Sequence, residues 1–242
     1  MSIIKHIPNT ITLANLLSGV AGVIVTLSGN PAAGFICMLA AAVFDFCDGL
    51  AARLFNAHSP IGKELDSLSD VVSFGVLPAV MLWVVMPKGA PLYVHVIPLL
   101  LAAFSAVRLA KFNLDTRQES DFIGLPTPAA ALLVGALSHF MEASPATSFS
   151  QFAASSFWLI PALALVLSTL LVSGVPMFGM KIKKGHKLLD GKRLVFLGFA
   201  ILSVAFTVAF SLRWSLAILL IFAFYILENV FVWLFCKKLK TN

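Results

Sequence analysis

Long apolar segments alternate with short turn-forming stretches along almost the whole chain. The eight apolar segments lie at roughly 10–28, 31–57, 65–86, 90–113, 126–142, 156–173, 194–210 and 213–237. Most of them approach the ~20 residues that a helix needs to cross a bilayer. With 60% hydrophobic and 12% charged residues, a chain of 242 residues could not hide this apolar surface as a soluble domain. The sequence predicts an all-α integral membrane protein with about eight transmembrane helices in a single domain over residues 1–242.

The basic residues indicate how these helices are oriented. When the segments alternate across the membrane from a cytoplasmic N-terminus, all but two of the 17 Lys and Arg residues fall on the cytoplasmic side. The exceptions are Lys88 and Arg213, and the densest basic stretch is 181–193. We therefore expect both termini in the cytoplasm. The net charge of +6 is explained by this topology and by contact with membrane lipids, so we expect no nucleic-acid partner.

Four aspartates fall within 26 residues, at the predicted cytoplasmic ends of the second and third helices. Asp45 and Asp48 are three residues apart, and Asp66 and Asp70 are four apart. Because residues at these spacings share a helix face, each helix can present two carboxylates to a common cavity. Carboxylates at membrane depth are costly and indicate function. Hard divalent cations bind carboxylate oxygens, so the cluster predicts a metal site that could hold two ions.

The residues between these aspartates suit a phosphate compound. Gly49, Ala51 and Ala52 keep the second helix slim, so a phosphorylated group can approach its backbone. Arg53 and Lys63 place positive charge beside the cavity, although both could serve only as topology signals. A single glycine such as Gly49 could equally serve close helix packing.

The aspartates and the residues between them form a pattern that resembles the signature of the CDP-alcohol phosphotransferase family. The pattern is Asp45-x2-Asp48-Gly49-x2-Ala52-Arg53-x8-Gly62-x3-Asp66-x3-Asp70. The resemblance implies a helical membrane core, usually of six helices, and the transfer of a phosphatidyl group from a CDP-linked lipid to an alcohol. It further implies Mg²⁺ or Mn²⁺ as cofactor, and it is compatible with a homodimer.

The resemblance also implies roles for single residues. Asp45, Asp48, Asp66 and Asp70 would hold the metal ions, and Asp70 would also be the general base that deprotonates the alcohol. The CDP moiety would be bound by Gly49, Ala52, Arg53 and Gly62. A base is needed on physical grounds too, because an alcohol is a poor nucleophile at neutral pH.

Four further stretches resemble the phosphatidylserine synthases of this family, which use CDP-diacylglycerol and L-serine. They begin at Ile7, Asp66, Arg108 and Phe122, and the last contains Gly-Leu-Pro-Thr-Pro-Ala-Ala at 124–130. Serine carries a carboxylate and needs a cation in its pocket. We expect Arg108 and Lys111, three apart on the fourth helix, to supply it. Lys111 could instead only reach toward the membrane surface.

Other functions stay open on the sequence alone. The same site could serve glycerol 3-phosphate, an inositol compound or choline. A metal- or proton-coupled transporter could also place aspartates in the membrane, but its polar groups should then cross the whole depth, whereas all four acids lie at one end. A purely structural membrane protein would leave the aspartates unexplained.

Overall fold

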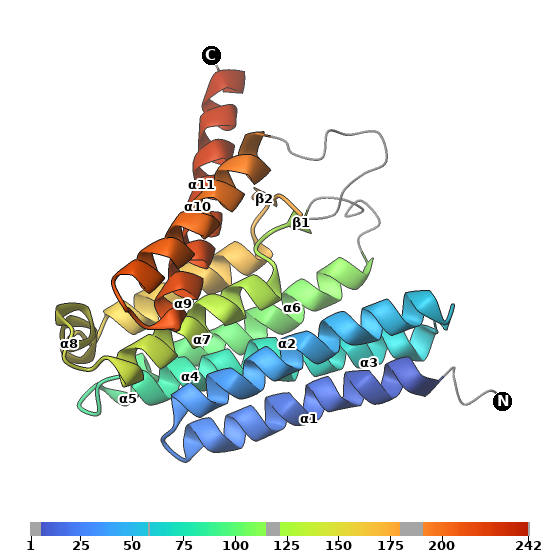
Figure 1. Ribbon diagram of the computed structural model, residues 1–242, viewed down its shortest axis with the longest axis horizontal. Helices are drawn as coiled ribbons and strands as arrows, with labels where there is room; N and C mark the ends of the chain where they lie inside the picture. Colours follow the sequence, from blue (N-terminus) through green and yellow to red (C-terminus); the bar gives the residue numbers. More distant parts are fainter. Residues whose placement is uncertain (1–5, 58, 115–121, 180–190, 242) are drawn as a thin grey trace.

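The fold was analysed in a computed structural model, which describes residues 6–57, 59–114, 122–179 and 191–241, with side chains up to 235. The basic stretch 181–190, Lys5 and Arg117 lie outside the described residues. The chain is almost entirely helical (Figure 1). The first half contains α1 (Ile7–Leu27), α2 (Pro31–Leu54), α3 (Pro60–Asp70), the π-helix η2 (Val71–Val76), α4 (Leu77–Val85), α5 (Leu92–His95), the 3₁₀ helix η3 (Ile97–Leu99) and α6 (Leu100–Leu114). The second half contains α7 (Thr127–Ala143), α8 (Ser148–Ser155), α9 (Leu159–Val172), α10 (Gly191–Ala209) and α11 (Trp214–Thr241).

All eight apolar segments are helical, which confirms the predicted all-α membrane class. Six continuous helical stretches among the described residues are long and apolar enough to cross a bilayer. A seventh span arises if α8 and α9 are counted together, although they are bent by 88°. The predicted count of about eight spans is not confirmed, because α7 has 17 residues and α9 only 14. The cytoplasmic position of both termini stays a prediction.

Local sequence signals set the helix starts around the acidic residues. The Asn30 side chain caps α2 by accepting a hydrogen bond from the Ala33 amide at 2.8 Å. Ser59 caps α3 in the same way, accepting from the Gly62 amide at 3.0 Å, and Pro60 takes the first helical position. The third helix therefore begins at Pro60, five residues before the predicted start at 65. Asp66 consequently lies well inside a helix that begins close to the end of α2.

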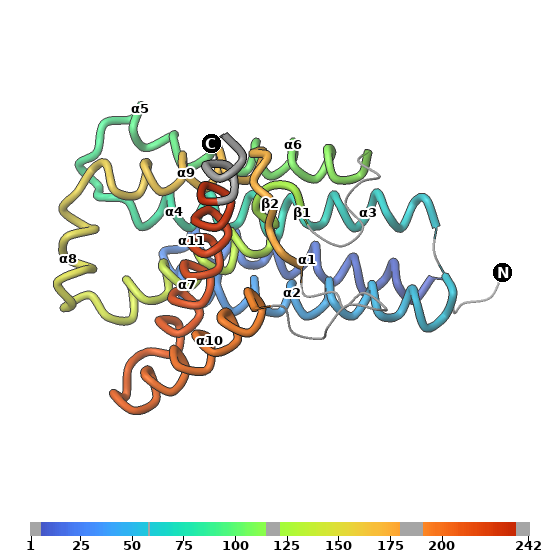
Figure 2. Tube along the Cα trace, turned by 90° about the horizontal axis from the view of Figure 1, so that it is seen from above, coloured from blue at the N-terminus to red at the C-terminus, as the bar shows by residue number. Residues whose placement is uncertain are grey.

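The centre of the bundle is α7, whose side chains are mostly buried. It contacts α2, α4 and α11, while α1 packs along α2 on the outer side (Figures 1 and 2). The hairpin of α10 and α11 runs obliquely across the other long helices (Figure 1). Large apolar side chains such as Phe35, Leu77 and Met81 are fully buried in the interior.

Two very short strands, which the sequence did not predict, join parts of the second half. The strand β1 (Phe122–Ile123) pairs antiparallel with β2 (Pro176–Met177). Gly124 follows β1 with φ +82°, and a side chain there would lie 2.5 Å from the Leu171 carbonyl oxygen. Only glycine fits this backbone without strain. The pair therefore fixes the start of α7 against the end of α9.

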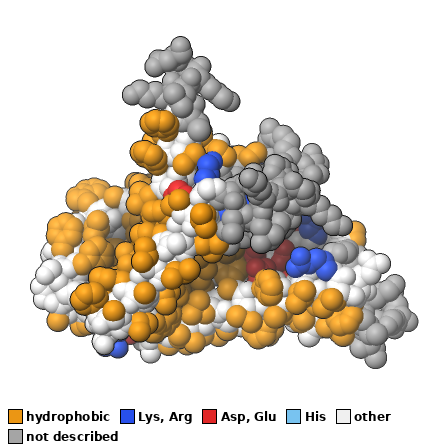
Figure 3. Space-filling model, turned by 45° about the horizontal axis from the view of Figure 1, so that its top comes forward, with side chains coloured by type: hydrophobic (Ala, Val, Ile, Leu, Met, Phe, Trp, Pro, Cys, Tyr) orange, Lys and Arg blue, Asp and Glu red, His pale blue; other side chains and the backbone are white. Residues whose placement is uncertain are grey.

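Apolar side chains cover most of the outer surface (Figure 3). Leu17, Leu54, Val208 and Phe231 are all more than 60% exposed. In water such a surface would be unfavourable, whereas lipid chains solvate it. The protein is therefore an integral membrane protein.

Small residues bring the first and third spans into close contact. A side chain on Gly19 of α1 would collide with Ser73 of η2, and the Ser73 hydroxyl donates to the Asn15 carbonyl at 3.1 Å. Close approach through small residues is typical of helices packed in membranes. The π-helical turn begins directly after Asp70, and such turns occur often at functional sites.

Candidate functional site

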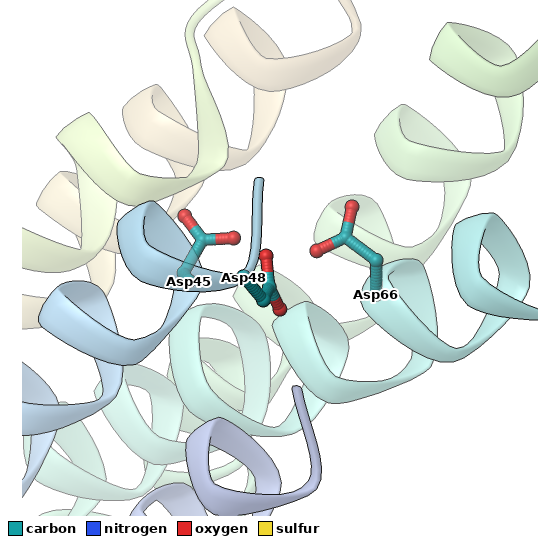
Figure 4. Close-up of side chains that lie close together, drawn as sticks. All are labelled: Asp45, Asp48 and Asp66. Atoms are coloured by element: carbon teal, nitrogen blue, oxygen red, sulfur yellow. The ribbon is translucent and has the colours of Figure 1, made fainter. Parts of the chain in front are cut away.

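Three of the four predicted aspartates converge. One carboxylate oxygen from each of Asp45, Asp48 and Asp66 lies within 4.8 Å of the other two. Asp45 and Asp48 project from α2, and Asp66 reaches toward them from α3 (Figure 4). The geometry follows from the helix pattern, because each pair at i, i+3 or i, i+4 presents one face to the neighbouring helix.

The surroundings of these carboxylates suit a divalent cation. Asp48 is only 6% exposed, and its Oδ2 atom has no hydrogen-bond partner among the described residues. A buried carboxylate oxygen without a partner is strongly unfavourable. Three carboxylates this close also repel one another when all are ionised. A bound cation with oxygen ligands would remove both costs, so these residues fit a metal site.

A cavity of about 710 Å³ opens beside the three carboxylates. All four residues predicted to surround CDP line it, namely Gly49, Ala52, Arg53 and Gly62, together with Asp48 and Asp66. Apart from the backbone of its own helix and its chain neighbours, no described atom lies within 4 Å of the position where a side chain on Gly49 would begin, so that part of the cavity wall is open. In Figure 3, acidic side chains gather next to Lys or Arg side chains in a recess of the apolar surface.

Two basic residues at this cavity have defined partners. Arg53 Nε donates to the Gly49 carbonyl on the preceding turn at 2.9 Å. Lys63 Nζ donates to the Asn113 carbonyl at 3.0 Å, and the Asn113 amide donates to Ser67 Oγ at 2.8 Å. The last turn of α6 is thereby attached to α3 at the mouth of the cavity. Arg53 and Lys63 both line the cavity, and each also donates a hydrogen bond to the backbone beside it.

Asp70 is not among the three carboxylates that lie within 4.8 Å of one another, but it interacts electrostatically with all three, and it is only 8% exposed. Its Oδ1 atom accepts a hydrogen bond from the side-chain amide of Asn15 on α1 at 3.2 Å. Asn15 is fully buried, and its own Oδ1 has no partner among the described residues. Asp70 therefore belongs to the same acidic cluster as the other three carboxylates. The metal-ligand role expected of all four stays a prediction.

The two residues predicted to bind serine have different surroundings. Arg108 is 6% exposed, and its guanidinium lies over the rings of Phe112 and Phe122, at 5.0 and 5.7 Å from their centroids. Asp70 acts on it as an attracting charge. Lys111, three residues later, is exposed. The helix spacing predicted a shared face, but Arg108 turns into the bundle and Lys111 does not.

Asn15 is the residue of this site that the sequence interpretation missed. It stands in the N-terminal stretch Ile7–Gly19, which resembles the family, but it received no role of its own. An asparagine inside a membrane helix is unfavourable unless its side-chain amide is hydrogen-bonded. Its presence in the first apolar segment is the sequence signal that could have identified Asn15. Its contact with Asp70 joins residues 55 positions apart and could not be located from spacing.

Comparisons with known proteins agree with this geometry. Residues 5–179 match the CDP-alcohol phosphatidyltransferase family. A protein of Mycobacterium tuberculosis named CDP-diacylglycerol–serine O-phosphatidyltransferase is 34% identical over 182 residues, which cover 72% of this chain and 61% of that protein. One of the same name from Bacillus subtilis is 34% identical over 134 residues, covering 55% of this chain and 76% of that protein.

An archaeal relative extends the comparison. The archaetidylserine synthase of Methanothermobacter thermautotrophicus is 32% identical over 167 residues, which cover 68% of each chain. The matched part of this chain spans only about three fifths of the mycobacterial relatives.

Proposed function

Because the chain belongs to the CDP-alcohol phosphatidyltransferase family, we propose that it transfers the phosphatidyl group of CDP-diacylglycerol to L-serine, giving phosphatidylserine and CMP. In this reaction the serine hydroxyl oxygen forms a bond to the phosphorus of the phosphatidyl group. The bond from that phosphorus to the CMP oxygen breaks, and the hydroxyl proton passes to a base on the enzyme. Relatives from three groups of microorganisms carry serine in the names of their reactions or products.

Asp45, Asp48 and Asp66 are our candidates for holding a divalent cation, Mg²⁺ or Mn²⁺. Their mutual approach within 4.8 Å and the unpartnered Asp48 Oδ2 support this assignment. Bound divalent ions in such a site supply charge neutralisation on the phosphate oxygens during an in-line displacement. Asp70, which interacts electrostatically with these three carboxylates, is our further candidate ligand for a second ion.

The cavity beside the carboxylates is the proposed place of the CDP moiety. Its open wall at Gly49 and the small side chain of Ala52 leave room for a nucleotide against the α2 backbone. Arg53 and Lys63 line the same cavity and would attract the diphosphate. The diacylglycerol tails would extend from there into the bilayer along the apolar outer surface.

Arg108 is our candidate for the residue that selects serine as the acceptor, by binding its carboxylate. A buried guanidinium whose Nη2 atom has no hydrogen-bond partner among the described residues is suited to receive a carboxylate. Asp70 is an electrostatic neighbour of Arg108. A serine bound to Arg108 through its carboxylate would therefore have its hydroxyl near Asp70, which would accept the proton while Asn15 holds its other oxygen. Lys111 is exposed and contributes less to this pocket.

We further propose that the site faces the cytoplasm. Arg53 near the end of α2 and Lys63 near the start of α3 are both at the cavity, and the bond from Lys63 to Asn113 brings the end of α6 to the same side. A concentration of basic residues at one membrane face supports a cytoplasmic location of that face. A homodimer stays a prediction from the family.

The test is turnover by the purified full chain in detergent with CDP-diacylglycerol and Mn²⁺ or Mg²⁺. Each alcohol is supplied in turn, and CMP release is followed. We expect release with serine and little with glycerol 3-phosphate, inositol or choline. Release with one of these alcohols but not with serine would refute the acceptor. Ion flux in liposomes without any CMP release would refute the transferase reaction itself.

A matched variant tests the role of Arg108. Arg108→Ala should raise the KM for serine by about tenfold or more, because a charge-assisted pair is worth about 1.5–3 kcal/mol. The KM for CDP-diacylglycerol should not change. The same substitution at exposed Lys111 should alter the serine KM much less. An unchanged serine KM in Arg108→Ala would remove this residue from the acceptor pocket.

A further inference from the structure

The C-terminal helix α11 lies outside residues 5–179, which match the family, yet two of its side chains bind the backbone of a single residue inside that region. Tyr225 donates its hydroxyl to the Phe178 carbonyl at 3.0 Å. Asn229 accepts from the Phe178 amide at 3.1 Å, and its own amide donates to the Tyr225 carbonyl at 2.7 Å. Both side chains are more than 90% buried. Phe178 is thereby held at both of its backbone polar groups.

Phe178 directly follows β2. Because β2 is hydrogen-bonded to β1, the position of Phe178 also affects the position of β1. Phe122 of β1 pairs with Met177 of β2, and the Gly124 amide donates to the Val175 carbonyl at 2.9 Å. α11, β2 and β1 lie next to one another in both ribbon views (Figures 1 and 2). Backbone pairing leaves little freedom between the strands, so a shift of Phe178 would move Phe122 as well.

Phe122 is one of the two rings that lie over the guanidinium of Arg108. The other ring, Phe112, lies 6.1 Å from Phe122, so the rings and the cation form one cluster. Tyr225 is also, like Asp70, an electrostatic neighbour of Arg108. One of the two rings that orient the guanidinium, Phe122, therefore belongs to a backbone segment that is linked to α11.

We infer that Tyr225 and Asn229 are positioning residues for the acceptor pocket, and that α11 sets serine affinity through Phe178, the β1–β2 pair and the Phe122 ring over Arg108. The inference rests on the proposed function, in which Arg108 binds the serine carboxylate. It gives the C-terminal hairpin a part in acceptor recognition in addition to its part in membrane anchoring.

Packing alone does not account for this arrangement. The rings of Phe178, Phe196 and Tyr225 contact one another at centroid distances of 5.1 to 5.8 Å, and a phenylalanine at 225 would make the same ring contacts. An asparagine amide or a tyrosine hydroxyl inside a membrane helix is costly unless it is hydrogen-bonded. Here each side chain has a hydrogen bond to the Phe178 backbone, and the Asn229 amide also donates to the Tyr225 backbone carbonyl.

The experiment compares Tyr225→Phe and Asn229→Ala with wild-type full-length protein in the CMP-release assay, with serine and CDP-diacylglycerol varied separately. We expect the serine KM to rise about threefold in Tyr225→Phe and somewhat more in Asn229→Ala, since one interhelical hydrogen bond in a membrane has an effect of about that size. The KM for CDP-diacylglycerol should stay constant. The control is Ser203→Ala on α10, whose hydroxyl donates to the Phe199 carbonyl of its own helix and which should leave both values unchanged.

A double-mutant cycle with Phe122→Leu separates positioning from general loosening. If Tyr225 acts through Phe122, the double variant should show less than the product of the two single effects on serine KM. Multiplicative effects, an equal rise of both KM values, or unchanged serine KM in both α11 variants would overturn the inference. A wild-type protein that releases no CMP with serine would instead refute the proposed function, so the two failures can be told apart.

Discussion

Asn15 donates a hydrogen bond to Asp70. Replacing Asn15 should therefore slow the chemical step without weakening the binding of CDP-diacylglycerol. In Asn15→Leu, a side chain of similar size removes the amide donor that lies 3.2 Å from Asp70 Oδ1. The Asn15 Oδ1 atom has no partner among the described residues, so no other bond is lost from this side chain. The backbone bond from Ser73 to the Asn15 carbonyl is kept.

The size of the effect follows from the charge and burial of the acceptor. Hydrogen bonds to charged groups contribute about 1.5–3 kcal/mol. Asp70 is 8% exposed, so water can replace the lost donor only in part. Because about 1.4 kcal/mol corresponds to a factor of ten in rate, we expect kcat to fall by roughly 10- to 100-fold. Neither Asn15 nor Asp70 lines the cavity proposed for the CDP moiety, so the KM for CDP-diacylglycerol should change little.

The assay is CMP release at saturating serine and CDP-diacylglycerol. Thr26→Val is the matched control, because Thr26 is fully buried near the other end of α1 and its hydroxyl has no partner among the described residues. This variant should turn over normally. Asn15→Asp, which places a second carboxylate against Asp70, should be slower than Asn15→Leu. If Asn15→Leu kept kcat within about twofold of wild type, Asn15 would have no role in orienting the base.

Three further predictions concern the acidic residues and the fold. Asp70→Asn should abolish turnover and leave binding of CDP-diacylglycerol largely intact; near-normal turnover would remove Asp70 as the base. Asp48→Asn should raise the Mn²⁺ concentration for half-maximal activity by about tenfold or more, because it removes one carboxylate charge from the group of three, and an unchanged metal dependence would contradict the assigned ligand set. Gly124→Ala should destabilise the protein by about 1–3 kcal/mol, seen as a lower thermal midpoint in detergent, whereas Gly174→Ala, which meets no atom within 4 Å, should not.

The helices could be predicted from the sequence because their signals are local. Each apolar segment carries its own length and hydropathy, and Pro31 and Pro60 mark helix starts directly. The third helix nevertheless begins at Pro60, five residues before the predicted start at 65. Its first turn contains Lys63 and Glu64, so the apolar residues that mark a membrane helix appear only after it. α8 has only eight residues and follows a turn, so its hydropathy does not mark it as a separate apolar segment.

The contacts between distant segments could not be predicted in the same way. The two-residue strands β1 and β2 have no periodicity to detect and exist only because α7 and α9 bring their ends together. The hydrogen bond that Asp70 receives from Asn15 on α1 is a second contact of this kind. Helix spacing placed Arg108 and Lys111 on one face, but it could not say that the bundle buries only Arg108.

The π-helical turn between Asp70 and Leu77 has a consequence for any insertion or deletion in the third span. An α-helix advances by about 100° per residue, and a π-helical turn accommodates one residue more than an α-helical turn. Loss of a single residue from Val71–Val76 would allow this stretch to become ordinary α-helix. Because the turn holds the additional residue, this conversion would leave Asp66 and Asp70 in nearly the same direction relative to Leu77 and Met81, which are anchored in the core. Loss of a residue from the α-helical part Pro60–Asp70 would instead rotate the residues before it by roughly 100°. The π-helical turn is thus the place in the third span where one residue can be lost with little change in the direction of the acidic side chains.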